Sequence, residues 1–493
     1  MQENIVFIQN DQQLNEKVFN SYISLIQNFL ITHKAKLNDK IAVISENNLN
    51  TALLFHAITN AGYVFVPINP NYPVDLIKKL IDDTKINITL ISGESSHINS
   101  LIEHSPSIII EQMFEFINNN LNSKKNNQYL TIWRQVYYST IIFTSGSSSK
   151  SPKGVVHSLN HHIKSANKSN ANLFLNNKHR WLMTLPIHHI SGIAILMRAK
   201  QVNATVVFQD MNLTIIENIK KYNVTHISLV ASQLTDLLNN VKNIETLQKL
   251  DAVLIGGSAI PNSLIELAFN NNIKIYTSYG STEFASQIAT SSPNATLDQL
   301  KKSGKLLPNN KIKLNENKEI LVKSDTQFYG YYNQSFDEDI ENIIRIHNKD
   351  NQQYFHTNDI GQIDKNGYID IIGRLDNMFI TGGENIQPEE VEKQILKFDF
   401  ITNCIVSPIL DDKWGQRPVA FIELNLNNKN NFKEENFLDK LKSLLPNYSI
   451  PDLFLEWETD ENNTSIKNNR KFYDELAQLK KYKILFKKNS HTE

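Results

Sequence analysis

The stretch KIAVISENNLNTALLFHAITNAGYVFVPIN, residues 40–69, predicts the fold class of this chain. Two β-rich apolar runs, 40–46 and 63–69, flank a segment at 49–62 that has helical spacing of its apolar residues and ends at a glycine. Comparable strand-like runs recur with helical segments between several of them, at residues 86–92, 179–187, 204–210, 224–231, 250–257 and 273–280. Strands that alternate with helices imply an α/β fold with parallel sheets covered on both faces.

The pattern of predicted secondary structure changes after about residue 310, from alternating strands and helices to mainly strands. Segments 310–325 and 361–375 have the pattern of hairpin strands with Asn/Gly turns, which predicts a β-rich subdomain over about 305–375. A helix, two strands and a helix follow at 388–398, 401–410, 418–424 and 436–445. We therefore predict a large N-terminal domain of mixed and parallel sheets over 1–375 and a small α+β C-terminal domain over 376–493.

Composition excludes several classes of protein. The chain has 493 residues, 41% of them hydrophobic, and a formal net charge of -1, without the basic excess that nucleic-acid binding requires. Its single cysteine, Cys404, cannot form an intrachain disulfide, so we expect a reducing cytoplasm and a buried thiol. The N-terminus lacks a signal-peptide pattern, and no run reaches the roughly 20 apolar residues of a membrane span. Homo-oligomerisation stays open.

A loop rich in hydroxyl groups occurs in YYSTIIFTSGSSSKSPKGVVHS, residues 137–158. An apolar run ends at Thr144, and small residues with two lysines precede a helical pattern at 155–167. Backbone N–H groups in a strand-to-helix turn converge on phosphate oxygens, and lysines add charge. The Walker spacing is absent, so the loop is either an anion-binding loop of another kind or a Ser/Gly-rich linker.

Six blocks in order resemble the adenylate-forming enzymes, which comprise acyl-CoA synthetases, luciferases and peptide-synthetase adenylation domains. They are TSGSSSKSPKG at 144–154, YGSTE at 279–283, HTND at 356–359, GRLDN at 373–377, GGENIQPEEVE at 382–392 and SIKNNR at 465–470. The resemblance covers nearly the whole chain and implies a large domain followed by a small mobile one. The strings LPIHHISGIAILMRA and GRLDNMFITGGENIQPEEVE further resemble the branch of the family that ligates 2-succinylbenzoate to coenzyme A for menaquinone synthesis.

The resemblance implies a reaction in two halves. A carboxylate attacks the α-phosphate of ATP to give an acyl-adenylate and pyrophosphate, and coenzyme A then displaces AMP. Residues matched to the β- and γ-phosphates are Thr144, Ser145, Gly146, Ser147, Ser148 and Lys153; Tyr279 and Gly280 are matched to the nucleotide. Thr282 is matched to the α-phosphate. Glu283 is either the Mg²⁺ ligand or an exposed loop glutamate.

Further roles follow from the same matching. Asp359 would accept hydrogen bonds from both ribose hydroxyls, with Arg374 on the same side, unless it is a turn aspartate. Lys467 would bridge the carboxylate and the α-phosphate, unless it is one of many solvated lysines. Asp376 would be the hinge on which the small domain rotates.

The resemblance also implies sites for the two remaining substrates. The pantetheine tunnel would be lined by Thr381, Gly382 and Gly383, and the acyl pocket by His189, Ser191, Gly192, Gly256, Gly257 and Ser258. His188 and His189 are expected to pack or cap and not to act as bases, because the substrate carboxylate is already ionised near neutral pH. Arg198 is either the cation that binds the second carboxylate or a surface arginine.

Three departures from the family pattern bear on these roles. The phosphate loop is one residue longer than usual, and its second glycine position is Ser149. Asn358 replaces the glycine before Asp359, and asparagine tolerates a left-handed backbone better than most residues. Two other functions stay open: a different acyl-CoA or carrier-loading ligase, and a non-catalytic homologue. The matched charged residues count against the second.

Overall fold

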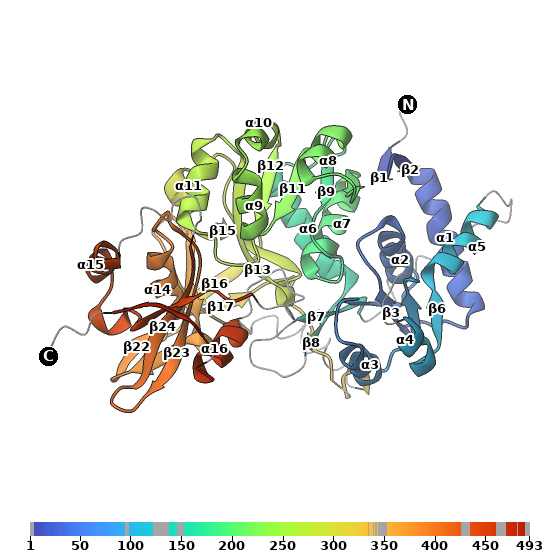
Figure 1. The fold of residues 1–493 in the computed structure, drawn as a ribbon. Helices are drawn as coiled ribbons and strands as arrows, with labels where there is room; N and C mark the ends of the chain where they lie inside the picture. The colour runs from blue at the N-terminus through green and yellow to red at the C-terminus, as the bar shows by residue number, and fades with distance from the viewer. Residues whose placement is uncertain are drawn as a thin grey trace.

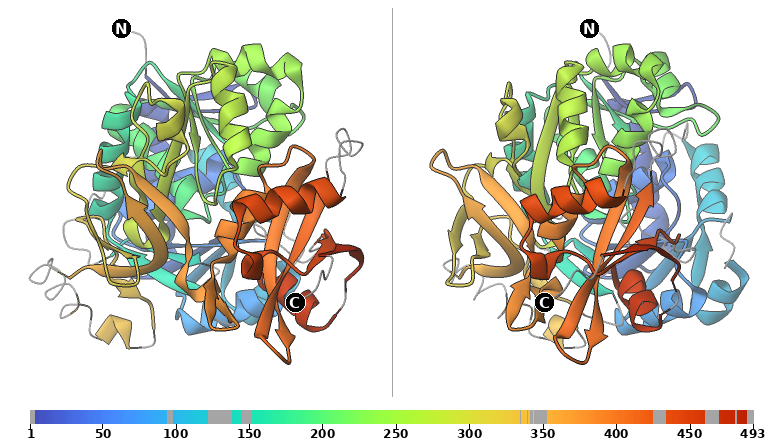
Figure 2. Two further views of the ribbon diagram at one scale, coloured as in Figure 1. Left: turned by 90° about the vertical axis from the view of Figure 1, so that its left-hand side faces the viewer. Right: turned by 60° about the vertical axis from the view of Figure 1, so that its left-hand side comes forward.

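A computed structural model describes residues 4–93, 98–121, 138–144, 152–333, 335–338, 340, 343, 353–424, 434–459, 470–480 and 482–488. The N-terminal strands and helices lie at the right of Figure 1, and the orange and red C-terminal elements lie at the left. Figure 2 turns this C-terminal side toward the viewer.

The first large sheet, within the described residues, has nine strands. Their order is β15 (Lys305–Leu306), β14 (Ser286–Thr290), β13 (Ile275–Ser281), β12 (Ala252–Ile255), β11 (His226–Leu229), β9 (Arg180–Met183), β10 (Thr205–Phe208), β1 (Ile5–Gln9) and β2 (Gln12–Asn15). All neighbours from β13 to β1 are parallel, while β2, β14 and β15 are added antiparallel at the edges. The sheet is therefore parallel at its centre and mixed as a whole.

The second large sheet, again over the described part of the chain, has seven strands. Their order is β18 (Gly330–Tyr331), β8 (Lys153–His157), β7 (Thr140–Thr144), β4 (Val64–Ile68), β3 (Lys40–Ile44), β5 (Ile88–Ile91) and β6 (Ser107–Ile109). Strands β3 and β4 are parallel, and helix α2 (Leu49–Asn60) connects them. Gly62 follows that helix with a φ of 82°, so the strand–helix–strand unit predicted over 40–69 is confirmed.

Helices cover both faces of the large sheets. Further helices described in this part are α1 (Glu16–Thr32), α3 (Val74–Asp83), α4 (Ile98–His104), α5 (Ile110–Asn120), α6 (Leu159–Leu173), α7 (Ile190–Val202), α8 (Ile215–Tyr222), α9 (Ala231–Leu238), α10 (Ile244–Gln248), α11 (Asn262–Asn270) and α12 (Leu297–Leu300). Along β12, Val253 and Ile255 join a cluster with α8 to α12, while Ala252 and Leu254 face a different cluster. This alternation confirms a sheet that is covered on both faces.

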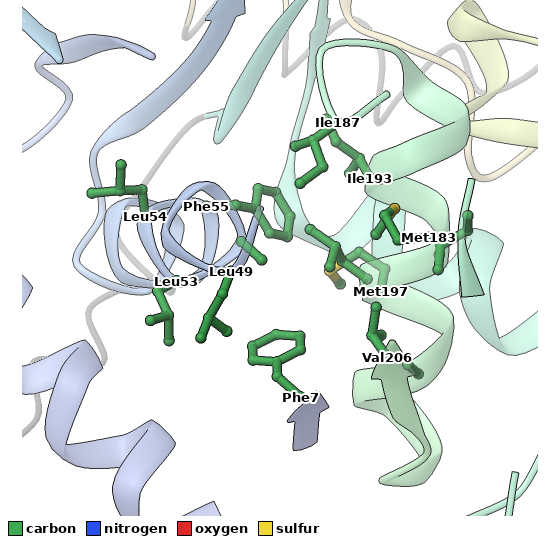
Figure 3. Close-up of a cluster of buried hydrophobic side chains, with 14 of the residues drawn as sticks. Phe7, Leu49, Leu53, Leu54, Phe55, Met183, Ile187, Ile193, Met197 and Val206 are labelled. Carbon is green, nitrogen blue, oxygen red and sulfur yellow. The ribbon is translucent and has the colours of Figure 1, made fainter. Parts of the chain in front are cut away.

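The apolar core lies between the two large sheets. Helix α2 is buried on nearly all sides, and Phe55 from this helix packs in one cluster with Phe7 of β1 and Met197 of α7 (Figure 3). Phe7 and Phe55 are almost fully buried, and burial of each ring stabilises the fold by about 2–3 kcal/mol. The two sheets are thereby held at a fixed separation, which positions the loops at their ends.

Smaller sheets follow along the chain. Strands β16 (Lys311–Leu314), β17 (Glu319–Lys323), β19 (Phe355–Ile363) and β20 (Ile369–Arg374) form an antiparallel sheet, and β21 (Phe379–Thr381) pairs with β22 (Glu384–Ile386). A last sheet contains β23 (Ile401–Asp411), β24 (Gly415–Leu424), β25 (Leu453–Glu456) and β26 (Ile484–Lys487), with helices α14 (Pro388–Ile395), α15 (Glu434–Leu444) and α16 (Arg470–Gln478).

The predicted fold class is confirmed: an α/β chain of mixed sheets with a β-rich C-terminal region. Cys404 is 7% exposed, as expected of a buried thiol. The domain boundary between residues 375 and 376 stays a prediction. Among the described helices, none combines the length and the apolar character that crossing a bilayer requires.

Candidate active site

The predicted phosphate loop connects two antiparallel strands. Thr144 ends β7 and pairs directly with Lys153, the first residue of β8. The prediction of a strand-to-helix turn is therefore wrong. Residues 153–157 form a strand because they pair with β7 on one side and with β18 on the other, and helix α6 begins only at Leu159, where the Ser158 side chain accepts from the backbone N–H of His161. Four of the predicted phosphate contacts, Ser145, Gly146, Ser147 and Ser148, lie outside the described residues.

A sharp corner follows β13 and carries the next two predicted residues. Gly280 lies so close to β14 that a Cβ atom there would meet the carbonyl oxygen of Ser286 at 1.9 Å, so the position requires glycine. Thr282 begins the short helix η3 (Thr282–Phe284), and its carbonyl oxygen accepts a hydrogen bond of 2.6 Å from Nε2 of His157. A buried histidine from the neighbouring sheet thus holds the corner in place.

Glu283 is held from two sides. Its carboxylate oxygen Oε1 accepts from the Tyr331 hydroxyl at 2.8 Å, and its carbonyl oxygen accepts from the N–H of Phe328 at 2.7 Å. The side chain is half-buried, so the alternative of an exposed loop glutamate is wrong.

The donor set at Glu283 fits Mg²⁺. Among the described residues, the second carboxylate oxygen of Glu283 has no hydrogen-bond partner, and no cluster of three or more His, Cys, Asp or Glu side chains forms. Magnesium is commonly held by one or two carboxylates together with phosphate oxygens and water, so one such carboxylate is sufficient. The metal-binding role of Glu283 stays a prediction.

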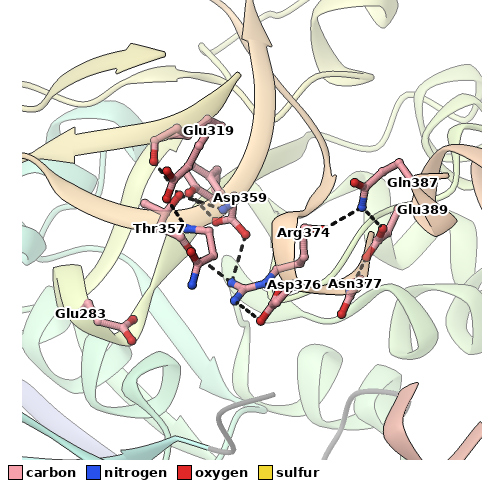
Figure 4. Close-up of polar contacts among 12 residues, drawn as sticks. Glu283, Glu319, Thr357, Asp359, Arg374, Asp376, Asn377, Gln387 and Glu389 are labelled. Carbon is pink, nitrogen blue, oxygen red and sulfur yellow. Dashed lines mark hydrogen bonds and ion pairs between the residues drawn. The ribbon is translucent and has the colours of Figure 1, made fainter. Parts of the chain in front are cut away.

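Asp359 lies within strand β19 and not in a turn, so the alternative of a turn aspartate is wrong. Its Oδ2 accepts from the Tyr279 hydroxyl at 2.6 Å. Its Oδ1 accepts from Nη1 of Arg374 at 3.2 Å, as Figure 4 shows. Burial raises the pKa of the Asp359 carboxyl, although these two donors oppose the shift. Each carboxylate oxygen keeps a further lone pair, so both can still accept from a ribose hydroxyl.

Asn358, which departs from the family glycine, has a left-handed backbone with a φ of 58°. Its N–H donates to Oε1 of Glu319 at 3.1 Å, and Glu319 is nearly fully buried. The expectation that asparagine tolerates a left-handed backbone here is confirmed, although the position lies within strand β19, where its pairing with β17 shifts register, and not in a turn.

The predicted hinge residue Asp376 is held by Arg374, which is in turn held by Gln387. Arg374 pairs with Asp376 through two hydrogen bonds, of 2.9 and 3.0 Å. The side-chain amide of Gln387 donates to the Arg374 carbonyl at 2.9 Å and to the Glu389 carboxylate. Gly373 permits this approach, because a Cβ atom there would lie 2.4 Å from Nε2 of Gln387.

The residues predicted for the pantetheine tunnel form a hairpin turn. Thr381 ends β21, and Gly382 and Gly383 follow with φ values of 56° and 89°. Both positions therefore favour glycine. The ring of Trp414 lies against Gly382, where a Cβ atom would be 2.7 Å from it.

The predicted acyl-pocket residues share one edge of the nine-stranded sheet. His189, Ser191 and Gly192 lie at the start of α7, after β9, while the segment 256–258, which contains Gly256, Gly257 and Ser258, follows β12. Ligands of open α/β sheets bind at the carboxyl ends of the parallel strands. Burial, and then the neighbouring His189 ring, lowers the pKa of His188 to about 3, so this imidazole is neutral and packed.

Arg198 is buried in α7 with an exposed fraction of 2%, so the alternative of a surface arginine is wrong. Its Nη2 donates to Gln287 at 2.9 Å and to Ser286 at 3.1 Å, and its guanidinium lies 5.4 Å from the centre of the Trp181 ring. Within the described part of the chain no carboxylate pairs with it, and its Nε has no hydrogen-bond partner. Burial lowers the pKa of Arg198 to about 9.

The catalytic lysine of the prediction, Lys467, lies outside the described residues. Arg470, which shares its block, is anchored to Oε1 of Glu392 at 2.6 Å and to the carbonyl oxygen of Val406 at 2.6 Å. Tyr279, Asp359 and Arg374 are brought into contact, whereas Lys153 and Glu283 both meet Tyr331.

Sequence reasoning missed two contact residues of this site. Tyr331 was not singled out, although it stands in the aromatic run FYGYY at 328–332. His157 was assigned to a helix, and it lies in β8 beneath Thr282. Both residues belong to the seven-stranded sheet and contact the corner that follows β13 of the nine-stranded sheet. A local sequence pattern does not reveal contacts between two sheets.

Comparisons with known proteins agree on one family. Residues 2–332 match the family model described as AMP-binding enzyme. The chain is 33% identical to a 2-succinylbenzoate–CoA ligase from Bacillus velezensis over 68% of each chain. It is 26% identical to the o-succinylbenzoate CoA synthetase (MenE) of Bacillus subtilis in complex with the acyl-adenylate OSB-AMP, with a TM-score of 0.77 and coverage of 92% and 91% of the two chains. The same B. subtilis enzyme in complex with ATP and magnesium gives 26% identity, a TM-score of 0.76 and 92% coverage of each chain.

Proposed function

This chain belongs to the AMP-binding enzyme family, and we propose that it ligates 2-succinylbenzoate to coenzyme A in menaquinone biosynthesis. The reaction consumes ATP with Mg²⁺, proceeds through an acyl-adenylate and releases pyrophosphate and AMP. It is thus an acid–thiol ligase of the AMP-forming kind, with ATP, coenzyme A and the acid as its small-molecule substrates.

The observation that carries this choice of acid is the buried Arg198. A cation that is 2% exposed and has no carboxylate partner among the described residues is costly to the folded state. An anionic ligand group supplies the missing partner. 2-Succinylbenzoate has two carboxylates, one that reacts with ATP and one that remains to pair with this cation. Benzoate and fatty acids have only the first.

The nucleotide is held at its two ends by different parts of the chain. Thr144 and Lys153 lie opposite each other at the mouth of the phosphate loop, where they meet the β- and γ-phosphates. Asp359, with Arg374 beside it, accepts from the ribose hydroxyls. Mg²⁺ held by Glu283 neutralises charge on the phosphates, and positioning with electrostatic stabilisation accounts for most of the catalysis.

The second half-reaction uses the C-terminal part of the chain. Residues 376–493 form a domain that rotates at Asp376 between the half-reactions. The turn at Thr381 to Gly383 then lines the path of the pantetheine arm, because its glycines leave room beside the backbone. Lys467 bridges the reacting carboxylate and the α-phosphate in the first half-reaction only.

The test is pyrophosphate release from the purified protein with ATP and Mg²⁺, with 2-succinylbenzoate or with a matched panel of benzoate, cinnamate and fatty acids. Coenzyme A is added in parallel to trap the thioester. We expect release with 2-succinylbenzoate alone, loss of release in Lys467→Ala, and retention in the neighbouring control Lys471→Ala.

Two results would contradict the proposal in different ways. Release only with another acid would keep the chemistry and replace the substrate. No release with any acid, from folded protein that binds ATP, would favour a non-catalytic homologue. A cytoplasmic location stays a prediction from the single cysteine.

A further inference from the structure

One aromatic side chain contacts both charged groups that flank the proposed phosphate site. The hydroxyl of Tyr331 donates to Oε1 of Glu283 at 2.8 Å, and Nζ of Lys153 lies 5.1 Å from the centre of the Tyr331 ring. The two contacts use different parts of the side chain: the hydroxyl orients the carboxylate, and the ring face attracts the ammonium group.

The backbone of Tyr331 is held firmly on both sides. It lies in β18, which pairs antiparallel with β8, the strand that begins at Lys153. The N–H of Tyr329 donates to the carbonyl of Val156 at 3.0 Å, and the N–H of Tyr332 donates to the carbonyl of Gly154 at 2.7 Å. The position of Tyr331 relative to the end of the phosphate loop is therefore set by the sheet.

The same segment is also attached to the corner that carries Glu283. The N–H of Phe328 donates to the Glu283 carbonyl at 2.7 Å, and the Phe328 ring packs edge-on against the Tyr331 ring at 4.9 Å. Glu283 is thus fixed at both its backbone and its carboxylate.

An ammonium and a carboxylate on adjacent elements tend to neutralise each other. Lys153 and Glu283 do not form an ion pair in the described part of the chain, and each contacts Tyr331 instead. The ring of Tyr331 contacts the ammonium group and its hydroxyl holds the carboxylate. Lys153 is thereby left for phosphate oxygens, and the second carboxylate oxygen of Glu283 is left for a cation.

We propose that Tyr331 is a positioning residue that orients Glu283 toward Mg²⁺ and keeps it from pairing with Lys153. This inference rests on the proposed function, because it takes Glu283 as the magnesium ligand. Hydrogen bonds to a ligating carboxylate commonly contribute about 10- to 100-fold to metal affinity.

The experiment measures the Mg²⁺ dependence of ATP binding by calorimetry, without any acid or coenzyme A. Tyr331→Phe keeps the ring and removes the hydroxyl. We expect it to raise the Mg²⁺ concentration at the binding midpoint about tenfold and to leave metal-free ATP binding unchanged. Tyr331→Leu also removes the ring, and we expect weaker metal-free ATP binding as well, because Lys153 is then free to pair with Glu283.

Tyr332→Phe is the matched control. Its hydroxyl donates to Asp337 at 2.7 Å and not to the proposed site, so its removal is expected to leave the Mg²⁺ midpoint unchanged. Thermal unfolding of each variant separates a local change from a loss of folding.

The outcomes distinguish this inference from the proposed function. An unchanged Mg²⁺ midpoint in Tyr331→Phe, or an equal shift in Tyr332→Phe, would overturn the role of Tyr331 alone. ATP binding that does not respond to Mg²⁺ in the unmodified protein would overturn it together with the role of Glu283. If Tyr331→Phe shows the expected shift in the Mg²⁺ midpoint but the unmodified protein ligates a different acid, the role of Tyr331 is supported and only the proposed acid substrate is refuted.

Discussion

Replacing Arg198 with methionine should stabilise the unliganded protein and weaken the binding of the acid. Burial lowers the pKa of Arg198 from its usual range to about 9, which corresponds to roughly 5 kcal/mol of lost solvation. The two hydrogen bonds from the charged Nη2 offset about 1.5 kcal/mol each, and the contact with the Trp181 ring about 1 kcal/mol more. Gln287 keeps the Ser169 hydroxyl as a donor after the change. The free energy of unfolding should therefore rise by about 1 kcal/mol.

The affinity of the variant for 2-succinylbenzoate should change in the opposite direction. Loss of a charge-assisted contact of about 1.5–3 kcal/mol corresponds to roughly 10- to 100-fold weaker binding. The assay is urea unfolding of both proteins, with and without 2-succinylbenzoate and with benzoate as the comparison. Without ligand the variant should unfold at higher urea, and only the unmodified protein should gain stability from the dicarboxylate.

The matched control is Lys200→Met, which removes a half-buried cation two residues along the same helix. It should leave the stabilisation by 2-succinylbenzoate unchanged. The reasoning is refuted if Arg198→Met lowers the free energy of unfolding of the unliganded protein. It is equally refuted if 2-succinylbenzoate stabilises that variant as much as the unmodified chain.

Three further changes test other parts of the site. Burial raises the pKa of Asp359, so the affinity for AMP should fall as the pH drops through that raised value. Tyr279→Phe removes a donor to the carboxylate, so the pH at which AMP affinity falls should be higher in this variant. Calorimetry of AMP binding against pH checks this, and the same pH midpoint in both proteins would contradict it. Gly373→Ala places a Cβ atom 2.4 Å from the amide at the end of the Gln387 side chain, which must then leave the Arg374 carbonyl; loss of that hydrogen bond should cost about 1 kcal/mol in urea unfolding, whereas an unchanged transition would argue against the contact. Gly382→Ala meets a φ of 56° and should raise the KM for coenzyme A while pyrophosphate release persists; a parallel loss of both would disagree.

Much of the site was predictable because its residues belong to contiguous blocks. The left-handed conformation of Asn358 was expected from its side chain, whereas the hairpin turn at Gly382 and Gly383 was not predicted. The strand-to-helix turn after Thr144 was predicted wrongly. The KGVVH segment becomes a strand only because it lies between β7 and β18, and no pattern within five residues reports on such neighbours.

The sequence by itself determined the alternation of strands and helices and the order of the functional blocks, because both depend on the local spacing of apolar, small and charged residues. Only the tertiary structure decided which side chains from distant blocks meet. Tyr331 reaches Glu283 across 48 positions, and Tyr279 reaches Asp359 across 80. The burial of Arg198 was likewise undecided, since one arginine in an apolar helix can face solvent or the core. Packing of the two large sheets sets these distances, and packing depends on the whole chain at once.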